Sequence, residues 1–379
     1  MSSASSVPSE AATLAPVAKQ PLHPSIIDRL DPEYIEFHNK YVVNIVPPHT
    51  LPWSPAIRNG MAVPGGTPLL KVAKTQDFDL PTTKCRAFTP EGTPPAGGWP
   101  LFIFFHGGGW TLGNIDSENS FCTNMAVRAE CVAITVDYRL APENPYPAAV
   151  DDAIDALKWA AENAPRELGT NPAKVAVGGS SSGGNLATIL ALKALELTPP
   201  LPVMFQLLVV PVTDNTASVA TSWRDREHAP WLSPGRMEWF KAFYLPDSRD
   251  WTRWDASPLF APDALIARLP PAWFGLAELD ILCPEGVSYA EKLRAAGVAV
   301  EVEVYKGAPH PIMGMDGASP SLRIESVWHA DMTGHSESRC RVSIYLKLSR
   351  CADYLPSVLS IGKKLVSDAA AALRKAFYG

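Results

Sequence analysis

The sequence predicts an α/β fold in which a mostly parallel central sheet carries helices on both faces. Short, wholly apolar runs recur along the chain, and such runs are typical of strands buried on both sides of a sheet. They cover residues 101–105, 131–136, 175–177 and 205–212. Segments with an apolar spacing of about 3.6 residues fill the intervals, and strands that alternate with helices favour parallel pairing.

Length and composition limit the classes of protein that fit. The 379 residues suffice for one large domain with an accessory piece or for two ordinary domains. Because 46% of the residues are apolar and 19% are charged, wholesale disorder is excluded. The net charge of -6 and the lack of a basic stripe argue against a nucleic-acid partner. The apolar runs are strand-sized, which predicts no membrane span.

The first half of the chain supplies the following elements in order. Residues 1–24 are rich in Ser, Ala and Pro without the pattern of a secretory signal, so we expect a disordered leader on a cytoplasmic protein. Asp31 and Pro32 predict the start of a short amphipathic helix over 31–41. A polar, hairpin-like region over 71–88 precedes the first buried strand. Helices over 147–163 and 185–197 then connect the strands.

The alternation of predicted strands and helices is interrupted in the middle of the chain and then resumes. Residues 214–262 hold five of the 11 tryptophans, which indicates either a lid over an apolar pocket or a subdomain with its own core. A strand over 271–279 follows, then a helix over 284–296 that begins at Pro284 and ends at Gly297. A strand over 298–305 and a helix over 361–377 complete the pattern.

These elements divide the chain into a leader, a core in two parts, and inserted segments. We expect a disordered leader (1–24), an N-terminal cap segment (25–66), the core (67–213 and 263–316), a cap insertion (214–262), an atypical insertion (317–360) and a final core helix (361–379).

The atypical insertion 317–360 is rich in Ser and Arg and shows no sustained period, so we expect it to be a disordered surface segment. An intervening sequence left in the gene model is an alternative origin. A metal site built from His329, His335 and Cys340 is a third interpretation. The six cysteines form no CxxC pair and show no metal-ligand spacing, which favours free thiols and predicts no metal and no cofactor.

The clearest catalytic motif is Gly179-Ser180-Ser181-Ser182-Gly183, which lies between a predicted strand and a predicted helix. This G-x-S-x-G spacing is typical of a nucleophile elbow, in which a serine on a strained turn exposes its hydroxyl. Neighbouring segments approach so closely that only very small residues fit two places either side. Ser181 alone among the three serines meets that requirement.

A glycine-rich loop follows the first buried strand as His106-Gly107-Gly108-Gly109-Trp110. Glycines allow successive N–H groups to point at one spot, as an oxyanion hole requires. We expect Gly107, Gly108 and Gly109 to contribute to this hole. We expect His106 to order the loop rather than to titrate.

An acid and a base follow later strands in the chain order serine, acid, histidine. Asp280 ends the strand over 271–279, and His310 follows the strand over 298–305. Because the carboxyl ends of parallel strands share one edge of the sheet, Ser181, Asp280 and His310 are expected to meet there. In such a group His310 accepts the serine proton and Asp280 fixes the imidazole tautomer.

Taken together, these motifs resemble those of the hormone-sensitive lipase-like esterases, most closely the fungal members. The resemblance is carried by HGGGW, by the segment Asp137-Tyr138-Arg139-Leu140-Ala141-Pro142-Glu143, by GGSSSGGN, by Asp280 with Glu285-Gly286, and by His310. The resemblance implies an α/β-hydrolase fold with a helical cap, and hydrolysis of short- to medium-chain or small apolar esters without a cofactor. It implies an oxyanion hole formed by the N–H groups of Gly108, Gly109 and Ser182. It also implies mainly structural roles for Tyr138, Arg139 and Glu143. The family usually has Asp or another larger polar residue where this chain has Ser180, and Ala at the position of Ser182.

Several points stay open at this stage. The pocket is expected to include Trp110, Trp231, Trp239 and Phe240. The substrate is a small-molecule ester, either a simple one or an acetylated or lactone-bearing metabolite, and a homodimer is an open alternative. An arylformamidase-type amidase is a second enzyme that fits the motifs. A non-catalytic receptor of the same fold is a third reading, which the presence of His310 disfavours.

Overall fold

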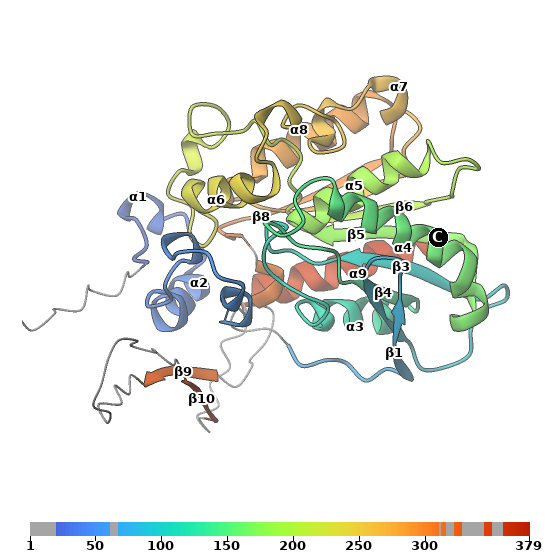
Figure 1. The fold of residues 1–379 in the computed structure, drawn as a ribbon, viewed down its shortest axis with the longest axis horizontal. Coiled ribbons are helices and arrows are strands. Elements are labelled where there is room, and N and C mark those ends of the chain that lie inside the picture. Colours follow the sequence, from blue (N-terminus) through green and yellow to red (C-terminus); the bar gives the residue numbers. More distant parts are fainter. Residues whose placement is uncertain (1–19, 61–66, 311, 316–321, 328–344, 351–358) are drawn as a thin grey trace, which may run out of the picture.

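The computed structural model describes residues 20–60, 67–310, 312–315, 322–327, 345–350 and 359–379. An eight-stranded sheet forms the centre of the molecule (Figure 1), with strand order β1-β2-β4-β3-β5-β6-β7-β8. Its strands are β1 (Lys74–Asp79), β2 (Lys84–Thr89), β3 (Trp99–Phe105), β4 (Val132–Val136), β5 (Thr170–Ser180), β6 (Phe205–Val209), β7 (Ala272–Ala277) and β8 (Val300–Tyr305).

Pairing within the sheet confirms the predicted parallel core. The strands from β4 through β3, β5, β6 and β7 to β8 pair in parallel, whereas β1 and β2 form an antiparallel edge at the predicted hairpin. Every residue of β3, β4, β6 and β7 is buried. Strands enclosed on both faces need no polar alternation, which explains why they are continuous apolar runs in the sequence.

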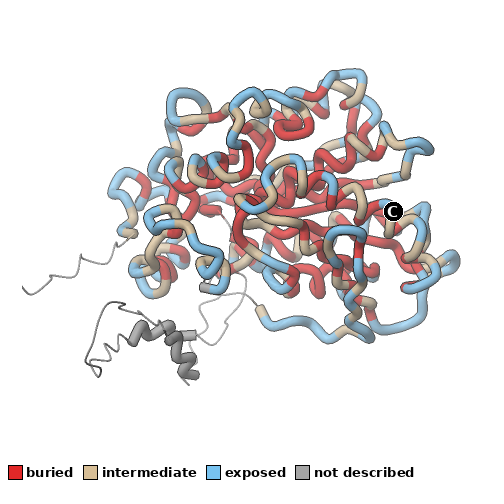
Figure 2. Tube along the Cα trace, viewed as in Figure 1, coloured by how far each residue is buried: buried red, intermediate tan, exposed pale blue. Residues whose placement is uncertain are grey.

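Helices cover both faces of the sheet, as the sequence predicts (Figures 1 and 2). The larger helices are α3 (Asn119–Arg128), α4 (Ala148–Leu168), α5 (Ser182–Ala194), α6 (Pro234–Tyr244), α8 (Cys283–Ala295) and α9 (Ser360–Tyr378). Residues of α4, α5 and α8 share one apolar cluster with Ile103 and Phe105, and residues of α3 and α9 share the other with Phe102 and Phe104. Alternate side chains of β3 therefore enter opposite layers.

The N-terminal segment lies beside the segment that connects β6 and β7. It contains α1 (Pro24–Ile27) and α2 (Pro32–Phe37), and Asp31 caps α2 by accepting hydrogen bonds from the N–H groups of Glu33 and Tyr34. The connecting segment contains α6 and the short α7 (Asp263–Ile266). Trp53 packs against Trp239 of α6, with ring centres 5.9 Å apart. This contact joins the N-terminal segment to α6, and the two lie next to each other in Figure 1.

Within residues 317–360 the structure describes a two-stranded antiparallel sheet of β9 (Leu322–Val327) and β10 (Tyr345–Arg350), together with residues 359 and 360. The remainder of that range lies outside the described residues, as do the leader residues 1–19 and the possible metal ligands His329, His335 and Cys340. Throughout the described ranges, each helix is too short or too polar to cross a bilayer.

Candidate active site

Ser181 lies on a strained turn between β5 and α5. Its backbone has φ 54° and ψ -118°, a left-handed conformation that side chains rarely adopt and that costs energy. A Cβ on Gly179 would lie 2.2 Å from the carbonyl oxygen of Gly183, and one on Gly183 would lie 1.9 Å from that of Phe105. The predicted need for glycine two places either side of the serine is therefore confirmed.

Asp280 and His310 are brought together beyond the ends of β7 and β8. Nδ1 of His310 lies 2.7 Å from Oδ2 of Asp280, and both residues are buried. A carboxylate can only accept, so Nδ1 carries the proton and Nε2 is left free to accept one. The N–H of Leu282 donates to Oδ1 of Asp280 at 3.0 Å, which fixes the carboxylate in place.

The three residues share one edge of the sheet because β5, β7 and β8 run in parallel. Among the described residues, no hydrogen bond joins the Ser181 hydroxyl to His310. The structure thus joins Asp280 to His310, but it does not join His310 to Ser181. Catalytic hydrogen bonds are often long without substrate and tighten when it binds.

The glycine-rich loop offers N–H groups close to the elbow. Gly108 and Gly109 have φ +123° and +59°, and a Cβ on Gly108 would lie 2.2 Å from the carbonyl oxygen of Leu112. The N–H groups of Gly108, Gly109 and Ser182 donate to no acceptor in the described part of the chain. They are therefore free to donate to an oxyanion, and Ser182 adds the positive end of the α5 dipole.

Gly107 differs from its neighbours in the loop. Its N–H donates to Oε2 of Glu118 at 3.3 Å. Because this N–H already donates to a carboxylate, Gly107 is removed from the set of oxyanion donors expected from the sequence. Glu118 belongs to no catalytic motif in the sequence, because its surroundings are those of an ordinary polar turn.

His106 is buried and contacts both the glycine-rich loop and Tyr138. Its ring stacks on Tyr138 with centres 4.3 Å apart, and its Nδ1 lies 2.8 Å from the carbonyl oxygen of Gly107. Burial lowers the pKa of His106, which favours the neutral ring. Tyr138 donates to the carbonyl oxygen of His106 at 2.8 Å. These contacts support the expected ordering role of His106 and the bracing role of Tyr138.

The four aromatic residues expected in the pocket lie in different surroundings. Phe240 covers the loop, because a Cβ on Gly109 would lie 2.2 Å from its Cγ. Trp239 is partly buried beside Phe240, with ring centres 5.1 Å apart. Trp231 is buried, and the guanidinium of Arg236 lies 5.0 Å from its ring centre. Trp110 is fully buried and stacks on Tyr244 at 4.3 Å, which places it in the core rather than on a pocket wall.

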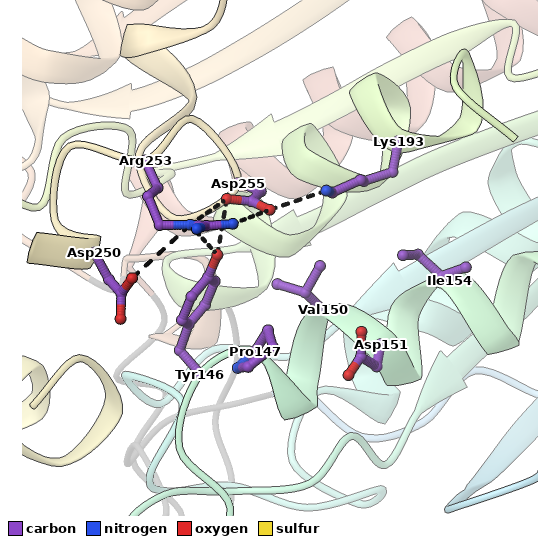
Figure 3. A pocket seen from close by; sticks show the side chains of 9 residues that line it. All are labelled: Tyr146, Pro147, Val150, Asp151, Ile154, Lys193, Asp250, Arg253 and Asp255. Carbon is purple, nitrogen blue, oxygen red and sulfur yellow. Dashed lines mark hydrogen bonds and ion pairs between the residues drawn. The ribbon is translucent and has the colours of Figure 1, made fainter. Parts of the chain in front are cut away.

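A surface cleft of about 380 Å³ lies at the far end of α5 (Figure 3). Asp255 lies at its centre and accepts hydrogen bonds from Tyr146, Lys193 and Arg253. Ser181 caps one end of α5 and Lys193 lies near the other, about 18 Å away at 1.5 Å per residue. The cleft is therefore separate from Ser181, and most of its charged groups pair with one another.

Cysteines and metal-binding groups add nothing to this centre. The described cysteines, Cys85, Cys122, Cys131 and Cys283, are buried free thiols. Burial raises the pKa of the Cys283 thiol to about 11, so it is not a nucleophile at neutral pH. No group of three or more metal-binding side chains gathers within the described ranges.

Comparisons with known proteins find related sequences. Residues 102–314 match the family described as having the alpha/beta hydrolase fold. The chain is 46% identical over 318 residues to an AB hydrolase superfamily protein of Schizosaccharomyces pombe, covering 80% of this chain and 93% of that one. It is 42% identical over 205 residues to carboxylesterase NlhH of Mycobacterium tuberculosis, covering 54% of this chain and 63% of the relative.

A further relative and a solved structure extend the comparison. Ethyl acetate hydrolase of Pseudomonas putida is 38% identical over 240 residues, or 62% of this chain and 72% of that protein. The crystal structure of an alpha/beta hydrolase from the metagenome of Lake Arreo, Spain, superposes with a TM-score of 0.73 at 28% identity. That superposition covers 93% of this chain and all of the other.

Proposed function

Because this chain belongs to the α/β-hydrolase fold family and is a carboxylic ester hydrolase like its carboxylesterase relatives, we propose that it acts through an acyl-enzyme formed on Ser181. His310 accepts the proton as the Ser181 hydroxyl attacks the ester carbonyl, and then donates it to the departing alcohol. A water molecule activated by the same imidazole releases the acid. The observation that carries the proposal is the 2.7 Å contact between His310 and Asp280 beyond the strand edge that also holds Ser181.

In this mechanism the oxyanion is stabilised by the backbone. The free N–H groups of Gly108, Gly109 and Ser182 receive the negative charge that develops on the carbonyl oxygen. Their positions are set before substrate arrives, because the close packing at Gly108 and at the elbow leaves little room for movement. The transition state therefore gains these bonds without a large cost of reordering the chain.

Aromatic side chains support the choice of a small apolar ester with a short or medium acyl chain. Phe240 lies directly against Gly109, and Trp239 extends the apolar surface toward Trp53. We propose that residues 25–66 and 214–262 together act as a cap that excludes water from the acyl-enzyme. The proposed substrates are a simple small ester and an acetylated or lactone-bearing metabolite. Four buried free thiols fit the proposed cytoplasmic location.

The test compares wild type with Ser181→Ala on p-nitrophenyl esters of increasing chain length and on an aryl formamide. We expect kcat on esters to fall by about 10⁴- to 10⁶-fold, as when a triad member is lost. A fluorophosphonate should label wild type but not the variant. Faster turnover of the formamide would replace the esterase with an amidase. Ligand binding without labelling or turnover would make the protein a receptor.

A further inference from the structure

The oxyanion loop and the nucleophile elbow belong to different strands that lie side by side. The loop follows β3 and the elbow follows β5, and Phe105 at the end of β3 pairs with Gly179 of β5. The two segments touch beyond that pair, because a Cβ on Gly107 would lie 2.7 Å from Oγ of Ser180. Catalysis by Ser181 needs the relative position of these segments to be fixed to within a fraction of an ångström.

One side chain from a third segment bonds to both. Glu118, in the turn before α3, accepts hydrogen bonds from the Ser180 hydroxyl, which lies 2.8 Å from Oε1 and 2.9 Å from Oε2. The same carboxyl accepts the N–H of Gly107 at 3.3 Å. Ser180 immediately precedes the nucleophile and Gly107 immediately precedes the free N–H of Gly108. A single carboxyl thus joins the residues next to both functional groups.

The position of Glu118 is energetically unfavourable, and no neighbouring contact in the described part of the chain compensates for it. Glu118 stands at the N-cap position of α3, yet its side chain makes no capping hydrogen bond to that helix. A side-chain cap is worth about 1 kcal/mol to a helix. Within the described ranges no Lys, Arg or His forms an ion pair with Glu118, and burial of the carboxyl raises its pKa to about 7. Perturbed acids of this kind concentrate at functional sites.

Ser180 fits this arrangement by its size. The family that the sequence resembles usually has a larger polar residue before the nucleophile, and a longer side chain at this position would enter the space between Gly107 and Glu118. A serine hydroxyl leaves room for the carboxyl to arrive from the α3 turn. The hydrogen-bonding group beneath the elbow is therefore supplied by a residue 62 positions earlier in the chain.

We propose that Glu118 is a positioning residue that ties the oxyanion loop to the nucleophile elbow through Gly107 and Ser180. This inference rests on the proposed function, because it concerns the geometry of attack by Ser181. Glu118 touches no reacting atom. It acts by holding the N–H groups of Gly108 and Gly109 at the correct distance from the carbonyl that Ser181 attacks.

The test compares Glu118→Ala with the conservative Glu118→Gln on one p-nitrophenyl ester. We expect Glu118→Ala to lower kcat by about 10²-fold, the scale of losing one oxyanion donor, while KM changes by less than about threefold. Glu118→Gln keeps an acceptor oxygen of the same reach, so its kcat should stay within about tenfold of wild type. A purely structural role would lower the amount of folded enzyme without changing the kcat of the folded fraction.

A double-mutant cycle with Ser180→Ala tests the link itself. If Glu118 acts through Ser180, the double variant should lose little more kcat than Glu118→Ala alone. Asp152→Asn is the matched control, because Asp152 is a buried carboxyl that binds Arg139 and makes no hydrogen bond to the elbow or the glycine-rich loop in the described part of the chain. It should lower thermal stability and keep kcat within about twofold.

Two results would overturn the inference while leaving the esterase intact. One is a folded Glu118→Ala enzyme with the kcat of wild type, and the other is fully additive loss in the cycle with Ser180→Ala. Should Glu118→Ala fail to fold, Glu118→Gln and Ser180→Ala provide the same comparison of kcat and KM. Hydrolysis that survives Ser181→Ala would remove the proposed function, and this inference with it.

Discussion

Asp280 holds His310 with one carboxylate oxygen and the backbone with the other. Oδ2 lies 2.7 Å from Nδ1 of His310, and Oδ1 accepts the N–H of Leu282 at 3.0 Å. Because Asp280 is fully buried, no water competes for either oxygen. The backbone bond thus determines which oxygen faces the imidazole, and through it the tautomer of His310.

Replacing Asp280 with Asn should therefore damage catalysis more than stability. The amide oxygen of Asp280→Asn would be drawn to the Leu282 N–H, which leaves an NH₂ group facing Nδ1 of His310. The imidazole would then carry its proton on Nε2 and could not accept one from Ser181. We expect kcat to fall by about 10⁴-fold, measured on a p-nitrophenyl ester.

Asp263→Asn is the matched control, because its side chain is 89% exposed. It should retain full activity. Equal kcat values for Asp280→Asn and wild type would show that His310 is not oriented by this acid.

Gly109 should tolerate no side chain, because Phe240 occupies the space that a Cβ would need. A methyl group there would lie 2.2 Å from Cγ of Phe240, so Gly109→Ala must displace either the loop or α6. We expect kcat to fall by about 10²-fold. If the ring is removed as well, the double variant Gly109→Ala with Phe240→Ala should have a kcat at least about tenfold higher than that of Gly109→Ala alone.

Gly169 supplies the control for backbone strain alone. It has φ +64°, close to the +59° of Gly109, but no atom lies within 4 Å of its potential Cβ. Gly169→Ala should cost about 1 kcal/mol of stability for the left-handed conformation and leave kcat unchanged. If Gly109→Ala and Gly169→Ala behave alike, crowding by Phe240 is not the reason for the glycine.

Much of the fold follows from local patterns in the sequence. Buried parallel strands are continuous apolar runs, and the elbow needs Gly179 and Gly183, so both could be recognised by spacing. The bounds of α3 were not predicted, because its buried face includes Thr123 and Asn124 and hides the apolar period.

The candidate site shows where spacing stops being informative. Glu118 binds Ser180 across 62 positions, and no local pattern marks such a contact. The direction of the Gly107 N–H depends on the same carboxyl and was therefore also missed. Trp110 adjoins the loop in sequence, yet its ring packs in the core against Tyr244. The orientation of this ring depends on tertiary packing, so the spacing of residues in the sequence does not predict it.

Asp255 should stabilise the protein in a way that is lost in acid. Burial alone would raise its pKa, but hydrogen bonds from Lys193, Arg253 and Tyr146 outweigh burial and lower the pKa to about 2 (Figure 3). A carboxyl whose folded pKa lies below its unfolded value of about 3.9 contributes stability above that value. The contribution disappears as the pH falls through about 2.

The measurement is urea unfolding of wild type and Asp255→Asn between pH 6 and pH 2.5. After a discount for the partly solvated surroundings, the stability difference should be about 1 to 2 kcal/mol larger at pH 6. A difference that does not change with pH would mean that the network around Asp255 contributes no charge-dependent stability.

Glu118 should show the opposite dependence on pH. Burial raises its pKa to about 7, and the hydrogen bonds from Ser180 and Gly107 lower it only in part. The folded protein thus holds the Glu118 proton more tightly than the unfolded chain, whose Glu pKa is about 4.3. The titratable groups beside it, Cys122 and Tyr138, have pKa values raised by burial and stay neutral over this range.

Relative to Glu118→Gln, wild type should therefore lose stability as the pH rises from about 4.3, and the loss should level off above about 7. Urea unfolding of the two proteins between pH 4.5 and pH 8.5 should show a total change of roughly 3 kcal/mol. A change of the opposite sign would mean that the carboxyl is better stabilised as an anion than its surroundings indicate, and that the α3 turn holds it without electrostatic cost.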